Sequence, residues 1–588
     1  MCGIAGIINK KESRVSTENV ERMLNTLTKR GPDDSGVHTS SQCTLGQTRL
    51  SIIDLNTGHQ PMVDGDLSIT FNGEIYNFKE LRGELVDKGH VFKTNSDTEV
   101  ILKAYREYGR ECPKHLDGMF AFAIWNDAKK ELFVARDRFG KKPFFYTEKN
   151  GYFVFASEIK AIFKSGFMDK DEINRGAIDD YLRFGYILPD KTIYKNINTL
   201  PPAHYGVVKN KSIKIGRYWN LEKKELNVSY EEAKSKIKSL IESAVEKRML
   251  ASDVEVGALL SGGVDSTYVS YLAQKHLDKP LKTFSVGYEG MRNELPFARQ
   301  ASEKIGTDHH ELPISSNVID ELEKIISYMD EPHADSSNFP QHLISKMAAE
   351  HVKVVLTGDG ADELFMGYGW YQKKWHMPRW RLDWRLINPY RAHQKAITIF
   401  KKNIRKKLVI KRTTLSMSLI KESIKGLSHP FHKINAFDLK VYLPAQLLTK
   451  IDRTSMMHSL EARAPFLDTE LAEYVYNLPN EFKISKTENK IILKDILVEI
   501  FPKEFVYRKK QGFGAPIDQW LGEEKMREFV HTTLESENLM YSFIDKTSVL
   551  KICDGFYAKK RNHAYKLWLL LNLALWFEYH KSTIHNCT

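Results

Sequence analysis

The 588-residue chain has few cysteines, and they are spread so widely that they form no recognisable pattern. The five are Cys2, Cys43, Cys112, Cys553 and Cys587, and no Cys-x-x-Cys pair occurs. An odd, scattered set argues against a disulfide scaffold and against a zinc site. We therefore expect a protein of the reducing cytosol, with a cytoplasmic localisation.

Long apolar runs are also missing. The longest candidate, 568–576, is far shorter than the roughly 18 to 20 apolar residues that cross a bilayer. The chain starts Met-Cys-Gly-Ile-Ala-Gly-Ile-Ile, which has no basic leader, so no secretory signal is expected. The sequence therefore predicts neither a membrane span nor export.

Net positive charge is confined to one segment. The net charge is +12, but residues 373–412 alone hold fourteen Lys or Arg and one acid, Asp383. The rest is close to neutral, which argues against nucleic acid as a partner and indicates a basic insertion at about 373–412. The segment reads as amphipathic helices with Trp375, Trp380 and Trp384. It is either a solvated insertion or a binding surface for an anionic acceptor or a partner.

What is present is the composition of a globular protein, 42% hydrophobic and 28% charged, in a chain too long for one core. The first 200 residues alternate short β-like runs with Gly, Asn and Asp. The expected strands are 3–8, 67–71, 120–125, 132–135 and 152–156, and the expected helices are 20–28 and 97–108. This pattern predicts an α+β domain, dominated by antiparallel sheets, over residues 1–205.

A polar connector over 206–228 separates this domain from a region with a different pattern of secondary structure. There, the expected strands 255–260, 281–286 and 352–356 alternate with helices such as 229–249 and 266–276. Such alternation predicts an α/β domain, 229–588, with a parallel sheet and helices on both faces. From about residue 440 onward the pattern is mainly helical.

Cys2 is the first candidate for chemistry. Once Met1 is removed, the free α-amine of Cys2 lies beside its own thiol, with unperturbed pKa values of about 7.7 to 8.0 and 8.5. The amine, through a water, can then accept the thiol proton near neutral pH, and no histidine is needed. The alternative is a buried cysteine at the start of a strand.

Four further segments accompany this cysteine in order along the chain. They are Arg30-Gly-Pro-Asp-Asp-Ser-Gly36, Gln47-Thr-Arg-Leu-Ser-Ile-Ile-Asp54, Asn72-Gly-Glu-Ile-Tyr-Asn77 and Ser96-Asp-Thr-Glu99. Together with Met-Cys-Gly-Ile-Ala-Gly they resemble the glutaminase domain of class II, or N-terminal-nucleophile, amidotransferases. The resemblance implies an αββα antiparallel sandwich that hydrolyses glutamine.

The same resemblance implies roles for individual residues. Cys2 is the nucleophile, and the Asn72 side-chain amide with the Gly73 N–H stabilises the oxyanion. Arg49, at the head of a buried strand, binds the substrate carboxylate bidentately, and Asp97 with Glu74 binds its ammonium. The full implied glutamine-binding set is Arg49, Leu50, Ser51, Ile52, Ile53, Asn72, Gly73, Glu74 and Asp97. As alternatives, Asn72-Gly73 is a hairpin turn and Asp97 only caps a helix.

A second candidate site lies at the strand-to-helix junction Leu259-Leu-Ser-Gly-Gly-Val-Asp-Ser-Thr267. Gly262 and Gly263 let the backbone approach an anion, while Ser261, Ser266 and the helix N-terminus offer donors. No Walker A motif is present. Ser-Gly-Gly-x-Asp-Ser resembles the pyrophosphate loop of ATP pyrophosphatases, which cleave ATP between the α- and β-phosphates. A chance Ser-Gly-Gly turn is the alternative.

Three carboxylates follow the strand 352–356, in Thr357-Gly-Asp-Gly-Ala-Asp-Glu-Leu-Phe-Met-Gly-Tyr368. Acids beside glycines suit Mg²⁺ bound together with phosphate oxygens, and the expected metal ligands are Asp265 and Asp362. A solvated turn is the alternative. The implied ATP-binding set is Leu260, Ser261, Gly262, Gly263, Asp265, Ser266, Val286, Thr357 and Gly358.

Two later segments extend the resemblance to glutamine-hydrolysing asparagine synthetases. They are Lys450-Ile-Asp-Arg-Thr-Ser-Met-Met-His-Ser-Leu-Glu-Ala-Arg-Ala-Pro-Phe-Leu-Asp468 and Tyr507-Arg-Lys-Lys-Gln-Gly-Phe513. The family forms a β-aspartyl adenylate from ATP and aspartate, which ammonia from glutamine attacks after internal transfer. By resemblance, Asp359 and Lys510 act in adenylation, although Lys510 also reads as a surface lysine. A homodimer is expected from the family alone.

Asp359 stands where well-known members carry Glu, although many relatives also have Asp there. Together with the basic segment it leaves the acceptor open. Aspartate is expected, and a carboxylated sugar such as a uronic acid is the alternative. A different class of hypothesis is that the chain is a non-catalytic, nucleic-acid-binding protein built on the same scaffold. It predicts decayed catalytic motifs, whereas the motifs here are intact.

Overall fold

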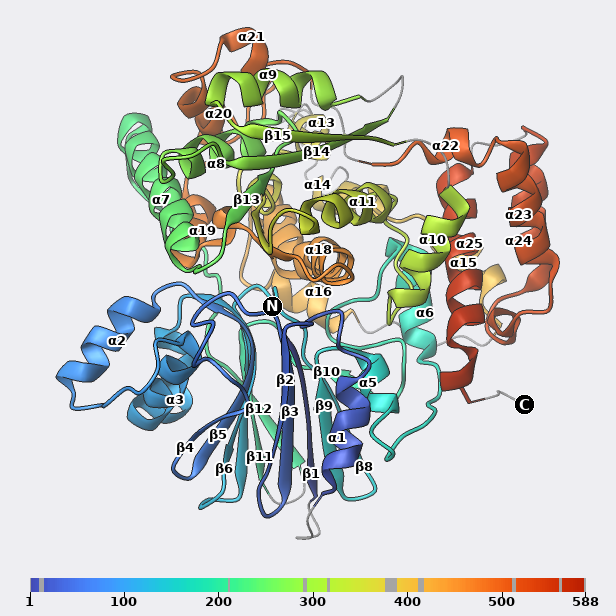
Figure 1. Ribbon diagram of the computed structural model, residues 1–588. Helices are drawn as coiled ribbons and strands as arrows, with labels where there is room; N and C mark the ends of the chain where they lie inside the picture. Colours follow the sequence, from blue (N-terminus) through green and yellow to red (C-terminus); the bar gives the residue numbers. More distant parts are fainter. Residues whose placement is uncertain are drawn as a thin grey trace.

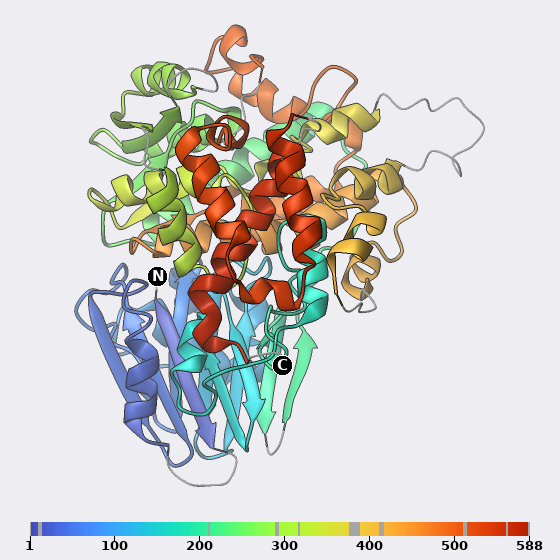
Figure 2. The same cartoon turned by 90° about the vertical axis from the view of Figure 1, so that its right-hand side faces the viewer.

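The computed structural model describes residues 2–9, 15–209, 212–288, 293–314, 318–375, 389–410, 417–509, 514–559 and 563–585. Figure 1 shows two stacked parts, with two antiparallel sheets below and a parallel sheet with many helices above. The amino terminus lies at the junction of the two parts in both views (Figures 1 and 2). The α+β and α/β classes expected from the sequence are confirmed.

The lower part is a sandwich of two six-stranded antiparallel sheets. The first has the order β10-β8-β9-β1-β3-β2 and the second β12-β11-β7-β6-β5-β4. The strands of the first sheet are β1 (Gly3–Asn9), β2 (Asp34–Thr39), β3 (Cys43–Arg49), β8 (Phe145–Lys149), β9 (Tyr152–Ala156) and β10 (Asn198–Thr199). Those of the second are β4 (Met62–Asp64), β5 (Leu67–Ile75), β6 (Gly118–Asn126), β7 (Glu131–Arg136), β11 (His204–Lys209) and β12 (Ser212–Arg217).

Apolar side chains from both sheets fill the space between them, including Ile4, Leu45, Ala123 and Phe155. Helices cover the two outer faces, because alternate residues of the same strands are apolar there as well. The helices are α1 (Thr17–Leu24) and α5 (Ile159–Phe163) on the first sheet, and α2 (Phe78–Asp87) and α3 (Asp97–Tyr108) on the second. This is the αββα arrangement that the sequence predicted.

The upper part is built around a five-stranded parallel sheet of order β15-β14-β13-β16-β17. Its strands are β13 (Val256–Leu259), β14 (Lys282–Tyr288), β15 (Asp308–Ile314), β16 (Val354–Leu356) and β17 (Glu461–Arg463). Helices pack on both faces. They are α7 (Tyr230–Leu250), α8 (Val264–Gln274) and α9 (Leu295–Ile305) on one face, and α10 (Val318–Tyr328), α11 (Asn338–Ala349) and α18 (Thr449–Met456) on the other (Figure 1).

Local sequence signals explain several helix starts. Ser229 and Glu232 form a reciprocal capping box at the start of α7. Ser96 caps α3 by accepting a hydrogen bond from the Thr98 N–H, so Asp97 is the first residue of the helix and not its cap. The chain beyond residue 440 is mainly helical, as expected, with the long buried helix α25 (Ala564–His580) near the C-terminus.

The stretch assigned to a connector carries structure of its own. Strands β11 (His204–Lys209) and β12 (Ser212–Arg217) extend the second sheet, so the chain without regular structure before α7 begins only at Tyr218. None of the described helices combines the length and the apolar composition that crossing a membrane requires.

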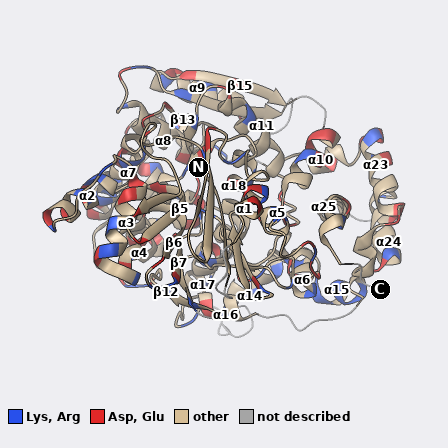
Figure 3. Ribbon diagram, turned by 60° about the horizontal axis from the view of Figure 1, so that its bottom comes forward, with Lys and Arg blue, Asp and Glu red and all other residues tan. Residues whose placement is uncertain are grey.

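The described part of the basic segment contains the end of α13 (Gly369–Trp375), α14 (Pro389–Ala396) and α15 (Lys402–Leu408). Trp380 and Trp384 lie outside the described residues, as does the side chain of Trp375. Basic residues gather on α15 (Figure 3), yet Arg405 is buried and donates to Asp179 at 2.9 Å. Helix α15 is therefore anchored in the fold.

Candidate active sites

Cys2 immediately precedes β1 and is 94% buried at the junction of the two parts. Its backbone nitrogen donates to Asn72 Oδ1 at 3.1 Å. Burial raises the pKa of the Cys2 thiol, and hydrogen bonds from the Leu50 N–H and the Gln47 side chain only partly offset this. The thiol is therefore largely protonated at neutral pH and needs a base to react.

Asn72 and Gly73 lie inside β5 and do not form a hairpin turn. They pair with Ala121 and Phe120 of β6, so strand β5 runs four residues further than the sequence suggested. Gly73 has φ +150°, and a Cβ there would lie 1.9 Å from the Met119 carbonyl oxygen, so only glycine fits. Asn72 Nδ2 is buried without a hydrogen-bond partner among the described residues, which leaves a fixed donor beside Cys2.

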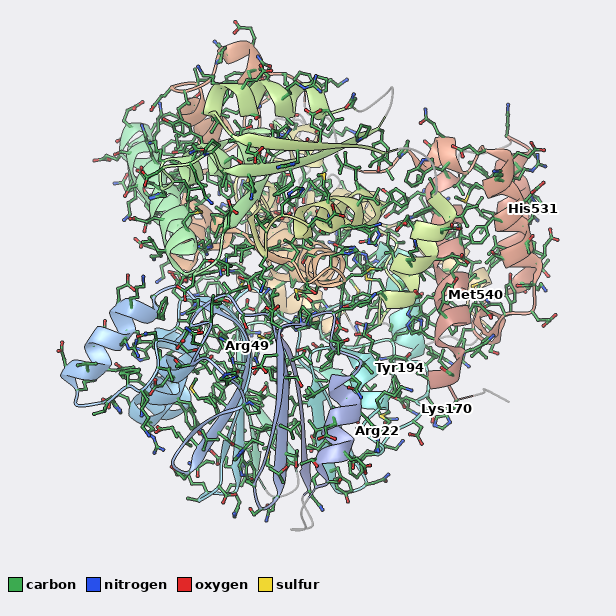
Figure 4. All side chains as sticks on the ribbon, viewed as in Figure 1. Arg22, Arg49, Lys170, Tyr194, His531 and Met540 are labelled. Carbon is green, nitrogen blue, oxygen red and sulfur yellow. The ribbon has the colours of Figure 1, made fainter. Side chains whose placement is uncertain are left out.

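Arg49 is the last residue of β3, and the expectation that it heads a strand is wrong. It lies at the end of the sandwich that faces the parallel sheet (Figure 4). Its Nη2 donates to the carbonyls of Ile53 at 2.9 Å and Asp54 at 2.8 Å, which fixes the guanidinium against the loop that follows. In that loop Leu50, Ile52 and Ile53 are buried, and the Ser51 N–H donates to Asp33.

Glu74 and Asp97 lie together and are both buried. Asp97 Oδ2 accepts from the Ile75 N–H at 3.0 Å, while burial raises the pKa of Asp97 to about 6. Burial also raises the pKa of Glu74 well above its usual value, and the negative charges of Glu461 and Asp97 raise it further. Two buried carboxyl groups of this kind favour a positively charged ligand.

Arg30 is a site residue to which the sequence gave no role. It is fully buried; its Nε donates to the Cys2 carbonyl at 3.2 Å, and its Nη1 and Nη2 donate to Asp452 of α18 at 2.8 and 3.0 Å. A third contact joins Nη1 to Glu158 at 3.0 Å. Arg30 therefore links the Cys2 backbone directly to the upper part of the molecule.

The loop Ser261–Gly263 connects β13 to α8 at the carboxyl end of the parallel sheet. The hydroxyls of Ser261 and Ser266 lie 3.1 Å apart, and the Gly263 N–H donates to Ser261 Oγ at 3.3 Å. Gly262 has φ +69°, and a Cβ there would lie 2.5 Å from the backbone of Phe297. The loop is thus a tight turn with hydroxyl and N–H donors at a helix N-terminus, a geometry that suits phosphate.

The second loop, which follows β16, packs directly against the first. A Cβ on Gly358 would lie 2.9 Å from Asp265 Cβ, so the two loops approach closely only because residue 358 is glycine. The Thr357 N–H donates to the Arg463 carbonyl at 2.8 Å, and the Asp359 N–H points to Thr357 Oγ1. Burial raises the pKa of Asp359, which Lys450 partly offsets.

Asp265 and Asp362, the expected metal ligands, come together around a lysine. Lys490 Nζ lies 2.5 Å from Asp265 Oδ2 and 2.6 Å from Asp362 Oδ1. Asp265 Oδ1 is buried without a partner among the described residues. The described residues contain no group of three or more His, Cys, Asp or Glu side chains that could hold a metal. The two carboxylates nevertheless suit a cation whose other ligands come from phosphate and water.

No local pattern singled out Lys490, because its significance arises only when residues 225 positions apart meet. Of the other expected residues, Val286 lies buried in β14, and the Leu260 N–H donates to the Phe284 carbonyl of the same strand at 2.8 Å. Lys510 lies outside the described residues.

A cavity lies between the residues around Cys2 and the two loops that follow β13 and β16. Its walls come from both parts of the molecule: Lys141, Lys142, Thr357, Asp359, Leu448, Ile451, Asp452, Ala462 and Ala464. Asp452 is the carboxylate that Arg30 ties to Cys2, and Asp359 belongs to the second loop. The cavity therefore borders the second loop and the carboxylate that Arg30 contacts.

Comparisons with known proteins agree along the whole chain. The profile of a glutamine amidotransferase domain matches residues 1–219, and that of asparagine synthase matches 236–578. Asparagine synthetase [glutamine-hydrolyzing] 3 of Bacillus subtilis is 33% identical, covering 92% of both chains. Its paralogue 1 is 32% identical over 98% of this chain and 96% of its own, and Arabidopsis thaliana asparagine synthetase 2 is 29% identical over 94% and 85%.

Among solved structures, a glutamine phosphoribosylpyrophosphate amidotransferase of B. subtilis matches at 16% identity and a TM-score of 0.29, over 54% of this chain and 70% of that one. The fold assignment rests on the sheet topology above and not on this likeness. The profile matches and the identity over nearly the full length place the chain in the asparagine synthase family, as a glutamine-dependent amidotransferase.

Proposed function

We propose that the chain hydrolyses glutamine at Cys2 and uses the ammonia to convert aspartate to asparagine through a β-aspartyl adenylate, with release of AMP and pyrophosphate. The observation that carries the proposal is the cavity between Asp452, tied through Arg30 to the Cys2 carbonyl, and Asp359 in the second loop. It supports a short internal route from a glutaminase site to an adenylating site. Such a route keeps ammonia away from bulk water, which would protonate it.

In the glutaminase step the Cys2 sulfur attacks the side-chain carbonyl of glutamine, and ammonia leaves with the proton taken from the thiol. Water then hydrolyses the resulting thioester to glutamate and regenerates the thiol. The α-amine that Met1 removal frees accepts the thiol proton, because burial keeps the thiol protonated until then. The unpartnered Nδ2 of Asn72 supports its proposed part in the oxyanion hole, with the Gly73 N–H as the second donor. Arg49 binds the substrate carboxylate, and Glu74 with Asp97 binds its ammonium.

In the adenylation step an oxygen of the acceptor carboxylate attacks the α-phosphorus of ATP, and pyrophosphate leaves. The paired hydroxyls and the N-terminus of α8 support the loop Ser261–Gly263 as the phosphate site, with Thr357 and Gly358 alongside. Asp265 and Asp362 would hold Mg²⁺, which neutralises phosphate charge when it is bound. Asp359 acts in adenylate formation, and Lys510 balances the negative charge there.

In the last step ammonia attacks the acyl carbon of the adenylate, AMP leaves with the carboxyl oxygen, and a proton is lost. The relatives above are named as asparagine synthetases, which favours aspartate over a uronic acid sugar as the acceptor. We further propose that the enzyme works in the cytoplasm, with ATP and Mg²⁺, as a homodimer.

The experiment is a panel of carboxylates, with aspartate and two uronic acids, incubated with ATP, Mg²⁺ and glutamine. AMP release and the mass of the amide product are measured. We expect AMP release only with aspartate, in equal amount to asparagine. AMP formation with a uronic acid but not with aspartate would contradict the proposed acceptor. Formation of ADP in place of AMP would contradict the adenylate.

A further inference from the structure

Arg463 belongs to β17 in the upper part, but its guanidinium reaches the Glu74 side chain of the sandwich. The residue is fully buried. Its Nη1 donates to the carbonyls of Arg248 at 2.6 Å and Ala251 at 2.9 Å, and its Nε donates to Glu461 at 2.6 Å. These contacts leave Nη2, which lies 3.8 Å from Glu74 Oε2.

Arg463 Nη2 and Glu74 Oε2 lie near each other without forming a hydrogen bond. Neither Arg463 Nη2 nor Glu74 Oε2 has a hydrogen-bond partner in the part of the chain that the structure describes, and 3.8 Å is too long for such a bond. The charged groups that face Glu74 are Asp97 from α3, Glu461 and Arg463 from β17, and the amino terminus. Three buried carboxyl groups thus face one arginine and the amino terminus, so the negative groups outnumber the positive ones in this cluster.

Arg463 donates a hydrogen bond to Glu461 of its own strand and only approaches Glu74. Although burial opposes ionisation, the amino terminus and, after it, the Arg463 guanidinium lower the pKa of the Glu461 carboxyl. The pKa of Glu74 goes the other way, because burial and the charges of Glu461 and Asp97 raise it. Burial and these charges therefore favour the protonated form of Glu74, and a further cation would oppose them.

The backbone of the same residue touches the other site. The Arg463 carbonyl accepts from the N–H of Thr357, the first residue of the second loop, at 2.8 Å, and β17 pairs with β16 just before that loop. A single residue thus contacts the glutamine pocket through its side chain and the second loop through its main chain.

We propose that Arg463, held by Glu461, is a positioning residue that leaves Glu74 without a cation, so that the ammonium group of glutamine completes the buried cluster. This rests on the proposed role of Glu74 in binding that ammonium. On binding, the Glu74 carboxyl gives up its proton to solvent, and the resulting carboxylate pairs with the unchanged ammonium. The upper part of the molecule thereby sets the charge of the glutamine pocket.

The test is calorimetric titration of glutamine into the Cys2→Ala variant, which cannot turn the substrate over. Titrations at pH 7 in two buffers of different ionisation enthalpy give the number of protons released. We expect close to one proton per glutamine bound, because Asp97, with a pKa of about 6, is already mostly ionised. In C2A/E461Q the freed Arg463 pairs with Glu74, so we expect less than about half as many protons and weaker binding.

Ammonium-driven AMP formation by each variant reports whether the upper part is folded. Should C2A/E461Q fail to fold, C2A/E461D replaces it, with an intermediate proton number expected. No proton release by C2A, or the same release with and without the Glu461 change, overturns the inference. The proposed function fails separately if C2A/E74Q binds glutamine as tightly as C2A, because Glu74 then has no part in binding.

Discussion

The sandwich and the parallel-sheet part hold their reactive groups in different ways. In the sandwich, Asn72 and Gly73 lie within a fully buried strand, and Cys2 is one residue away from another. In the parallel-sheet part, Ser261, Thr357 and Asp359 lie on loops that follow strands. Lys490 reaches Asp265 and Asp362, beside these loops, from just before a distant helix. The first site is rigid because ladder hydrogen bonds fix it, while the second is assembled from segments that lie far apart in the sequence.

The comparison implies that the two chemistries can be lost one at a time. The largest effect is expected from Cys2→Ala, which should remove only the chemistry of the sandwich. Glutamine-dependent amidation should fall by at least about a thousandfold, because the nucleophile is gone, while synthesis driven by free ammonium persists. Glutamate release and AMP formation are measured side by side. Cys553→Ala, another buried cysteine but on α24 (Lys546–Tyr557), is the matched control. Joint loss of both activities in folded C2A would contradict separate sites.

Asp265→Ala is the converse test, because it should remove only the chemistry of the parallel-sheet part. AMP formation should drop by about a thousandfold, since phosphate charge is no longer balanced, and glutamine hydrolysis should remain. Pyrophosphate release and glutamate release are the two measurements. Asp278→Ala, an exposed carboxylate just after α8, serves as the control. Full AMP formation in D265A would remove Asp265 from the proposed site.

Asn72→Ala sharpens the account of the rigid site. Loss of the unpartnered Nδ2 donor should lower kcat for glutamine hydrolysis by about a hundredfold and leave ammonium-driven synthesis unchanged. Asn126→Ala changes a buried asparagine at the end of β6 and is the control. A change in KM with kcat preserved would assign Asn72 to ground-state binding instead.

The smallest expected effect is a dependence on pH. Asp97 is ionised above about pH 6 and takes up a proton below it, so the charge that holds the substrate ammonium is lost on the acid side. The kcat/KM for glutamine, which the Glu74 proton already makes pH-dependent, should therefore fall about tenfold more steeply per pH unit below that value. Asp97→Asn should flatten this limb and lower kcat/KM at neutral pH. An unchanged acid limb in D97N would mean that another group titrates there.

The fold was largely predictable because hydrophobic periodicity is strong in both parts, and α3 was predicted to its end residues. The errors have local causes. Asn72-Gly73 has the composition of a turn, but pairing with β6 overrides it. Arg49 precedes the apolar residues Leu50, Ile52 and Ile53, which read as a strand but form a buried loop. The link through Arg30, Asp452 and Arg463 could not be predicted, because it depends on side chains hundreds of residues apart meeting between the two parts.

The three-residue strand β17 lies at the edge of the parallel sheet, beside the sandwich. Unpaired edges invite other chains to add a strand, and buried ions that lose their partners destabilise a fold. Cutting the chain between the two parts would uncover this edge together with the Glu461–Arg463 pair. The upper half alone should therefore self-associate when expressed, and a soluble version would need new polar side chains along that edge.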